Sequence, residues 1–145
     1  MASDSDTNDR GLTHVALGAT DVETSVDFYR RYADMDVVHR RHDDDTDTTV
    51  VWLSDHTRPF VIVLIEQSAV SHSLGGFAHL GVACESRAEV DRRCDRARAE
   101  GRDVFGPTDS GEPVGYWAIV TDPDGHNLEL SHGQEVGFTV AQAGI

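Results

Sequence analysis

Two short stretches of this chain follow the same pattern, and this repeat constrains the fold more than any other feature. The first stretch is LTHVAL at residues 12–17, followed by TDVE at 20–23; the second is AHLGVA at 78–83, followed by SRAE at 86–89. Each is an apolar strand that carries a histidine, followed by the Ser/Thr-x-x-Glu capping box of a helix start. A repeated strand–helix unit predicts two copies of one module packed together.

The rest of the chain fits the element order βαβββ in each copy. In the first copy we expect strands at 12–18, 37–39, 48–53 and 60–65 and a helix at 21–34; in the second, strands at 77–83, 103–105, 116–121 and 126–131 and a helix at 87–100. The fold class is therefore α+β, with each helix covering one face of its own sheet. The expected divisions are a flexible tail (1–10), a first module (11–66), a linker (67–76), a second module (77–132) and a C-terminal tail (133–145), which is compatible with a short edge segment.

Strand alternation predicts where the polar residues of these strands point. In the first strand of each module the bulkier apolar residues share one face, which should pack under the helix. His14 and His79 then lie on the opposite face, beside small residues. In the last strand Leu128 and Leu130 should also pack under the helix, which turns Glu129 the other way. Two histidines and one carboxylate thus face out of helix-backed sheets.

Composition limits the partners and the compartment. The 145 residues carry 26 Asp and Glu against 12 basic residues, all of them Arg, for a net charge of −14. Such a chain lacks the basic face that nucleic acid requires; its acidity fits a salt-rich cytoplasm or, equally, Asp-rich loops of an Arg-favouring genome. Cys84 and Cys94 match no zinc pattern and read as buried thiols. No apolar run is long enough to span a membrane and no signal-peptide core is present, so we expect a cytoplasmic protein without membrane contact.

Three segments give the chain a family resemblance that covers residues 12–131. LTHVALGATDVETSVDFY (12–29), FAHLGV (77–82) and VTDPDGHNLELS (120–131) resemble the vicinal oxygen chelate superfamily, which includes glyoxalase I, extradiol dioxygenases, methylmalonyl-CoA epimerase, fosfomycin-resistance thiol transferases and bleomycin-binding proteins. The resemblance implies two βαβββ modules that form a cup-shaped half-barrel around a site. It also implies that modules pair within one chain or across a dimer, and we expect a homodimer.

The resemblance further implies a metal centre. The family's metal-binding positions are occupied here by His14, His79 and Glu129. A set of two histidines and one carboxylate favours Fe(II) or Mn(II), with Zn or Ni as alternatives, and leaves positions open for a substrate with two adjacent oxygens. The alternative is that the three residues are ordinary polar residues lining a barrel, as in metal-free drug-binding members.

Two positions depart from the patterns of particular branches. Glyoxalase I and the epimerase add a fourth ligand at a position that aligns with Val63, and Glu66 should face the wrong way to replace it. Dioxygenases and thiol transferases usually carry a Tyr at the position of Ile119, whereas Tyr116 alternates to the other face unless the strand bulges.

The remaining candidates are side chains near these strands. His126, His132 and Tyr116 are candidate acid–base groups. Trp117 and Ile119 should share a cavity wall, and with Val63 and Trp52 they are candidate substrate-binding residues that favour an apolar or aromatic substrate portion.

These residues lead to a functional prediction with alternatives. We expect a divalent-metal-dependent enzyme, most similar to an extradiol dioxygenase, that chelates a small molecule through vicinal oxygens. The alternatives are a metal-free small-molecule binding protein of the bleomycin-resistance kind and a glyoxalase-type lyase or isomerase.

Overall fold

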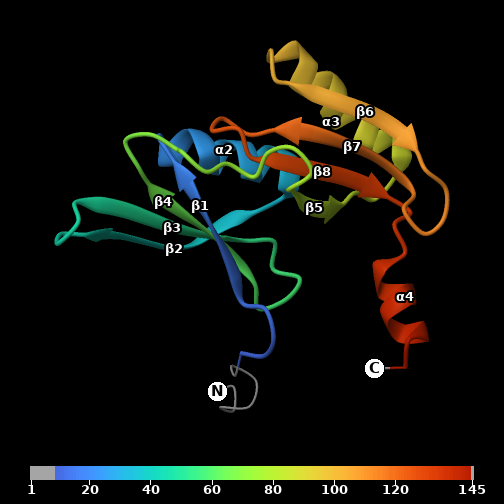
Figure 1. Cartoon of the computed structure of the whole chain (residues 1–145), viewed down its shortest axis with the longest axis horizontal. Helices are drawn as coiled ribbons and strands as arrows, with labels where there is room; N and C mark the ends of the chain where they lie inside the picture. Colours follow the sequence, from blue (N-terminus) through green and yellow to red (C-terminus); the bar gives the residue numbers. More distant parts are fainter. Residues whose placement is uncertain (1–8, 145) are drawn as a thin grey trace. The chain divides into compact units, whose positions relative to one another are not determined.

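The structure is a computed structural model that describes residues 9–144, so most of the predicted 1–10 tail and the last residue of the predicted 133–145 tail lie outside the described residues. The chain divides between Ser73 and Leu74 into two compact units, and each unit is described by itself (Figure 1). The two units correspond to the two modules of the sequence repeat. The structure therefore confirms an α+β fold built from two βαβββ modules.

The first module forms a four-stranded mixed sheet. Its elements are β1 (His14–Ala19), α2 (Val22–Ala33), β2 (Asp36–Asp43), β3 (Thr48–Ser54) and β4 (Val61–Glu66), with strand order β1-β4-β3-β2. β1 runs parallel to β4, and the other neighbours are antiparallel. The first and last strands of the module are therefore direct neighbours, although the whole module separates them in sequence.

The second module repeats this topology. Its elements are β5 (Leu80–Ala83), α3 (Arg87–Ala99), β6 (Val104–Asp109), β7 (Tyr116–Thr121) and β8 (Asn127–His132), with strand order β5-β8-β7-β6 and a parallel β5–β8 pair. A further helix, α4 (Val136–Gln142), follows β8, so the C-terminal tail is helical here and does not add an edge strand. None of the α4 side chains is buried.

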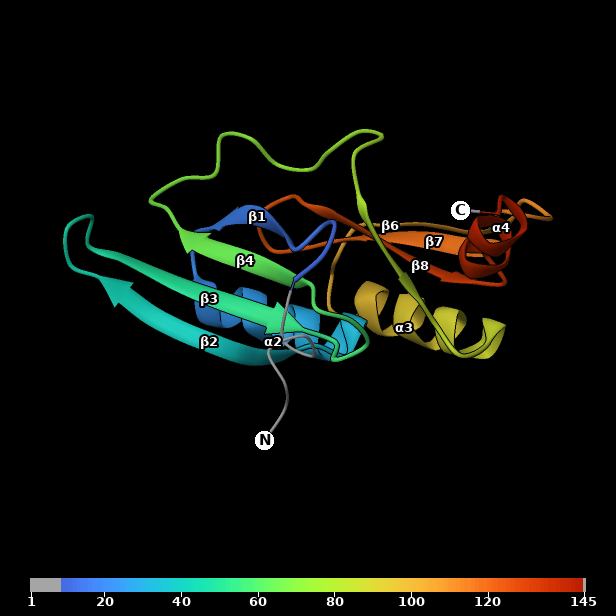
Figure 2. The ribbon, with the colours of Figure 1, turned by 90° about the horizontal axis from the view of Figure 1, so that it is seen from below.

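The helices α2 and α3 each cover one face of the sheet of their own module and form its core with that face (Figure 2). In the first module Phe28 of α2 contacts Tyr29 edge-on, with 5.0 Å between the ring centroids. Leu17 and Ile62 are buried on the face of the sheet that α2 covers. In the second module the side chains of Leu128 and Leu130 are fully buried, together with three residues of α3, Val90, Cys94 and Ala97. The predicted helix-facing side of β1 and of β8 is therefore the one that the core uses.

The helix starts differ in detail from the predicted capping boxes. The N-cap of α2 is Asp21 rather than Thr20, and its carboxylate accepts hydrogen bonds from the N–H groups of Glu23 and Thr24. Ser86 caps α3 as predicted. The second half of the box was wrong in both modules, because Glu23 pairs with Arg40 of β2 and Glu89 pairs with arginines of its own helix. An arginine partner offers a carboxylate a stronger, charge-assisted hydrogen bond than a backbone N–H does.

Some strand boundaries also differ from those expected. β2 and β6 are longer than predicted, and β6 continues past Pro107 through a register shift between Phe105 and Thr108. β5 begins at Leu80, so His79 lies immediately before the strand.

Both cysteines are buried thiols that form no disulfide, as predicted. Burial raises the pKa of the Cys94 thiol to about 11. In the described part of the chain, no helix is long and apolar enough to cross a membrane.

The Ser86 cap makes a prediction for stability. The hydroxyl of Ser86 accepts a hydrogen bond of 3.0 Å from the N–H of Glu89, which would otherwise lack a partner in the first turn of α3. Ser86→Ala should lower the free energy of unfolding by about 1 kcal/mol, measured by urea denaturation. Ser86→Asp should retain most of the stability that the cap supplies, because Asp is also a good N-cap residue. Ser73→Ala, at an exposed linker serine, is the matched control and should change little. An equal effect of both alanine variants would contradict this role of Ser86.

Candidate metal and substrate site

The second module has a cavity on the face of its sheet that α3 does not cover. The cavity has a volume of about 760 Å³ and is called the second-module cavity below. His79 and Glu129 line it from β5's start and from β8, and β6, β7 and the adjoining loops supply its walls. The walls include Phe77, Val104, Phe105, Val114, Trp117 and Ile119. Most of the lining is therefore apolar, with one histidine and two carboxylates set into it.

Strand register places His79 beside Glu129. In the parallel β5–β8 pair Gly81 lies opposite Glu129, and His79 precedes Gly81 by two residues, just before the strand begins. The Nε2 atom of His79 is 3.9 Å from Oε2 of Glu129. Gly81 leaves the room that the carboxylate occupies, since a Cβ atom at this position would lie 3.3 Å from Oε2. The pair is thus set by backbone pairing and not by a flexible loop alone.

The hydrogen bond of His79 on its other ring nitrogen determines what Nε2 can do. Nδ1 of His79 is 2.7 Å from the backbone carbonyl oxygen of Phe77. A carbonyl can only accept, so Nδ1 carries a proton, and in the neutral ring Nε2 presents its lone pair. This lone pair then faces a carboxylate whose side chain is about 10% exposed. Two electron-rich atoms so arranged can hold a cation between them, such as a bound metal ion.

The donor set fits a divalent metal but is incomplete within one module. Metal-binding histidines commonly donate their other ring N–H to a backbone carbonyl, as His79 does. Across residues 9–144, no group of three His, Cys, Asp or Glu side chains is close enough together to hold a metal ion. The second module therefore contributes two of the three predicted ligands, and the third predicted ligand, His14, belongs to the first module.

The walls of the second-module cavity are organised around Trp117. The indole N–H of Trp117 donates to the hydroxyl of Ser110 at 2.9 Å, and its ring stacks on Phe105 with 5.7 Å between centroids. Ile119 lies opposite Glu129 in the β7–β8 pair. The predicted pair of wall residues, Trp117 and Ile119, thus lies on the same cavity as the His79–Glu129 pair.

The first module has an equivalent cavity of about 510 Å³, which is called the first-module cavity. It is lined by His14, by Trp52 of β3 and by Val63 of β4. Val63 lies opposite Ala16, two residues after His14, just as Glu129 lies opposite Gly81, two residues after His79. Val63 therefore occupies the position in the first module that corresponds to Glu129, and it supplies no ligand.

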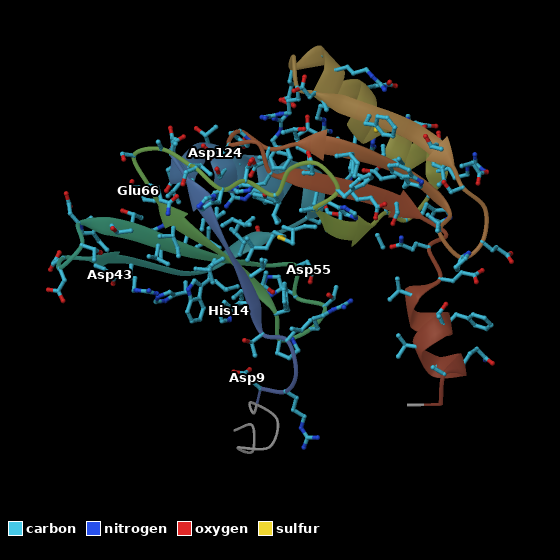
Figure 3. The ribbon with its side chains drawn as sticks, viewed as in Figure 1. Asp9, His14, Asp43, Asp55, Glu66 and Asp124 are labelled. Atoms are coloured by element: carbon cyan, nitrogen blue, oxygen red, sulfur yellow. The ribbon has the colours of Figure 1, made fainter. Side chains whose placement is uncertain are left out.

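Glu66 does not lie near His14. In the parallel β1–β4 pair His14 is opposite Val61, whereas Glu66 is opposite Ala19 at the other end (Figure 3). The separation of five residues corresponds to roughly 16 Å along the strand at about 3.3 Å per residue. One carboxylate oxygen of Glu66 accepts a hydrogen bond of 3.3 Å from the N–H of Thr49.

The structure places Tyr116 away from the second-module cavity. Its hydroxyl donates a hydrogen bond to Asp91 of α3, and the Arg87 guanidinium lies over its ring, 4.1 Å from the centroid. This hydrogen bond to Asp91 raises the pKa of Tyr116. Tyr116 therefore points to the helix side of the sheet, as alternation from Trp117 requires.

The other two candidate acid–base groups also lie outside the lining of the second-module cavity. His126 is buried, and its Nδ1 accepts a hydrogen bond of 3.0 Å from the N–H of Leu74. Nδ1 of His132 is 3.0 Å from the carbonyl oxygen of Cys84 and donates to it. Both ring nitrogens named here are used in backbone contacts within the second module.

The chain is similar to proteins of one known superfamily. Residues 11–130 match the model of the Glyoxalase/Bleomycin resistance protein/Dioxygenase superfamily. The chain belongs to this superfamily. It is 34% identical over 129 residues to the uncharacterized protein PA2024 of Pseudomonas aeruginosa, which covers 87% of this chain and 91% of that protein. It is 27% identical over 133 residues to the lactoylglutathione lyase of Escherichia coli O157:H7, with 87% of this chain and 95% of the enzyme covered.

A solved structure with the same fold is that of FosX, a fosfomycin resistance protein from Listeria monocytogenes. The TM-score is 0.70 at 18% identity, and the match covers 90% of this chain and 97% of FosX. That structure is of a FosX variant complexed with Mn(II) and 1S,2S-dihydroxypropylphosphonic acid. At this level of identity the likeness shows the fold.

Part of the cavity wall was not expected from the sequence. Val104, Phe105 and Val114 come from β6 and the loop after it, a region expected to be a three-residue strand and a Gly/Pro loop. Phe105 is 63% exposed, which is unusual for a large aromatic side chain. This exposure identifies Phe105 as a wall residue only when the extent of β6 is known. The sequence does not indicate that β6 continues here, because two prolines and two glycines in this region are typical of a loop.

The hydrogen bonds of two histidines predict opposite tautomers. At a pH where both rings are neutral, His79 should carry its proton on Nδ1, and His126, whose Nδ1 accepts from Leu74, should carry it on Nε2. Nitrogen-15 NMR of the imidazole rings, assigned with His79→Gln and His126→Gln, distinguishes the two forms. A bare Nδ1 on His79 would contradict the orientation of Nε2 toward Glu129.

Proposed function

We propose that this protein is a divalent-metal-dependent enzyme that binds a small substrate through two adjacent oxygen atoms. The observation that carries the proposal is the His79–Glu129 pair at the wall of a largely apolar cavity. The orientation of Nε2 toward the carboxylate gives the pair a preference for a cation. Enzymes place such a pair where a charged intermediate has to be stabilised next to an apolar substrate body.

His14 is the proposed third ligand. It lies on the first strand of its module, as His79 lies at the start of the first strand of the other, and its side chain lines the first-module cavity. In this proposal His14 joins His79 and Glu129 when a first and a second module pair, either within one chain or between two copies in a homodimer. Loss of the His14 side chain should therefore weaken metal binding.

The three donors favour Fe(II) or Mn(II), and Zn and Ni accept the same donors. When bound, the metal would supply Lewis acidity to the two substrate oxygens. The Mn(II) complex of FosX, a protein of the same fold, supports the choice of a divalent ion. His79 and Glu129 would hold the ion, and the Nδ1–H bond to Phe77 would keep the His79 ring in a binding orientation.

For the reaction we propose an extradiol-dioxygenase-like cleavage of an aromatic diol. Trp117, Phe105 and Ile119 offer a flat apolar wall beside the ligand pair, which suits an aromatic ring. Two histidines and one carboxylate form the ligand set typical of non-haem Fe(II) oxygenases. Val63 leaves no fourth protein ligand of the glyoxalase I kind, which favours this reaction over a glyoxalase-type one.

A glyoxalase-type lyase or isomerase is the second candidate enzyme, and the lactoylglutathione lyases among the relatives favour it. A metal-free binding protein is the third candidate, because the same apolar walls would suit an aromatic drug. The three candidates differ in measurable ways. Only the first needs O2, and only the binding protein functions without metal.

The proposal predicts the effect of removing one ligand. Protein purified without chelator or metal-affinity resin and reconstituted anaerobically should hold about one Fe, Mn, Zn or Ni ion per site, measured by elemental analysis. Glu129→Gln and His79→Ala should each weaken metal binding by at least the roughly 10–100-fold that is typical of losing an orienting partner. His14→Ala should do the same.

Glu66→Gln is the matched control, because it neutralises a carboxylate on β4, the first-module strand that corresponds to β8. This variant should bind metal as the unchanged protein does. Absence of metal after reconstitution, or equal binding by Glu129→Gln, would overturn the enzyme proposal in favour of the binding protein. With metal present, O2 consumption with a catechol supports the dioxygenase, and turnover of a glutathione hemithioacetal without O2 supports the lyase.

A further inference from the structure

We propose that the first-module cavity binds the anionic group of a small apolar acid, and that it does so without a metal. Two arginines line this cavity together with His14, and among the described residues Asp9 is the only carboxylate in its lining. The remaining lining is largely apolar and includes Trp52, Phe60 and Val63. This inference goes beyond the proposed function, because it concerns the two arginines of the first-module cavity, assigns no role to His14, and concerns a ligand group of the opposite charge.

Arg58 is available to a ligand. Within residues 9–144 its guanidinium makes no hydrogen bond and no ion pair. Asp55, three residues away, forms no ion pair with Arg58 among the described residues, and one of its oxygens accepts hydrogen bonds from the hydroxyl and the N–H of Thr57 at 2.6 and 3.0 Å. Burial would raise the pKa of Asp55, but these hydrogen bonds and the nearby charge of Arg58 lower it, so Asp55 stays ionised. Among residues 9–144, Arg58 is therefore a cation at a cavity wall without a hydrogen-bond or ion-pair partner.

The loop that carries Arg58 is held in place by its own hydrogen bonds. The N–H of His56 donates to the hydroxyl of Ser54 at 2.9 Å, and the N–H of Phe60 donates to the carbonyl oxygen of Arg58 at 2.8 Å. The bonds between Thr57 and Asp55 add to these. A loop fixed in this way presents Arg58 to the cavity at a lower entropic cost than a mobile loop would.

Arg41 adds a second positive charge. Its Nε donates to Asp43 at 2.9 Å, and Nη1 lies 3.2 Å from Nε2 of His39. His39 in turn packs against Trp52, with 4.7 Å between the ring centroids. Trp52 is 37% exposed and presents an aromatic surface to the same cavity as the two arginines. A ligand with an apolar ring and an anionic group would therefore meet both features.

The contrast with the second module shows that these arginines are not a consequence of composition. The chain has 26 acidic residues and 12 arginines, yet two arginines line the first-module cavity. The second-module cavity is lined by Asp103 and Glu129 and by no arginine. At the corresponding strand position the first module carries Val63 in place of Glu129, which removes the carboxylate that would repel an anion. The two cavities thus favour ligand groups of opposite charge.

Chemistry limits the class of ligand. A guanidinium binds carboxylates, phosphates and phosphonates through two parallel hydrogen bonds. The apolar remainder of the lining favours a compact hydrophobic body. The proposed ligand class is therefore an arenecarboxylate or an aryl phosphonate, and the experiment separates the two.

The test uses the full chain in the presence of excess EDTA, with benzoate as the probe. The protein has two tryptophans, one on each cavity, so the indole N–H signals report on the cavities separately by NMR. Trp52→Phe assigns the two signals. We expect benzoate to shift the Trp52 signal saturably and to leave the Trp117 signal in place. Phenylphosphonate, titrated in the same way, shows which anion binds more tightly, and neutral benzamide should bind several-fold more weakly than either.

Arg58→Gln should weaken benzoate binding by about tenfold, since it removes a charged hydrogen-bond donor. Arg30→Gln, at an exposed arginine of α2, is the matched control and should leave binding unchanged. Shifts confined to Trp117, equal affinity for benzoate and benzamide, or equal binding by the Arg58→Gln variant would each overturn the proposal. Because EDTA is present throughout, failure of the metal proposal would not alter this result.

Discussion

The parallel pairing of β5 with β8 is the interaction on which the candidate site depends. It joins the first strand of the second module to the last, across the helix and two other strands of the chain. The register of this pair sets Gly81 opposite Glu129 and brings His79 within 3.9 Å of the carboxylate. A shift of one residue would turn Glu129 toward α3 and replace it with Leu128 or Leu130 on the open face. The core residues that bury against α3 therefore also fix the orientation of the site.

The residues of each sheet face could be predicted from the sequence because alternation in a strand is a local property. His14, His79 and Glu129 were placed on the open faces from the apolar residues beside them, and Leu17, Leu128 and Leu130 are buried in the structure as that interpretation requires. Other features depend on competition between neighbours. Thr20 and Asp21 are both good N-cap residues one position apart, and only backbone geometry selects Asp21. Glu89 could have bonded to the cap, but Arg93 four residues later takes its carboxylate instead.

The wall of the second-module cavity shows why part of the site was not predictable. Phe105 lies opposite Ile119 in the β6–β7 pair, and β6 then continues through a register shift past Pro107, in a region whose glycines and prolines are typical of a loop. Pairing with β7 supplies the hydrogen bonds that local propensity does not favour. Such pairing is a contact between distant residues, and a single sequence does not reveal it. The same reason hid the start of β5 at Leu80, three residues later than expected, which leaves His79 just before the strand.

The two modules have kept one architecture while their open faces have diverged in charge. The backbone requirements are the same in both, since each needs a parallel first–last strand pair and a helix on one face. The open-face positions carry no such requirement, because they do not pack against the helix. Val63 and Glu129 occupy corresponding positions, yet one leaves its cavity to arginines and the other places a carboxylate beside a histidine. A duplicated fold can therefore carry unlike ligand-binding groups on its two modules, because the residues that specify the fold and those that specify the chemistry alternate along the same strands.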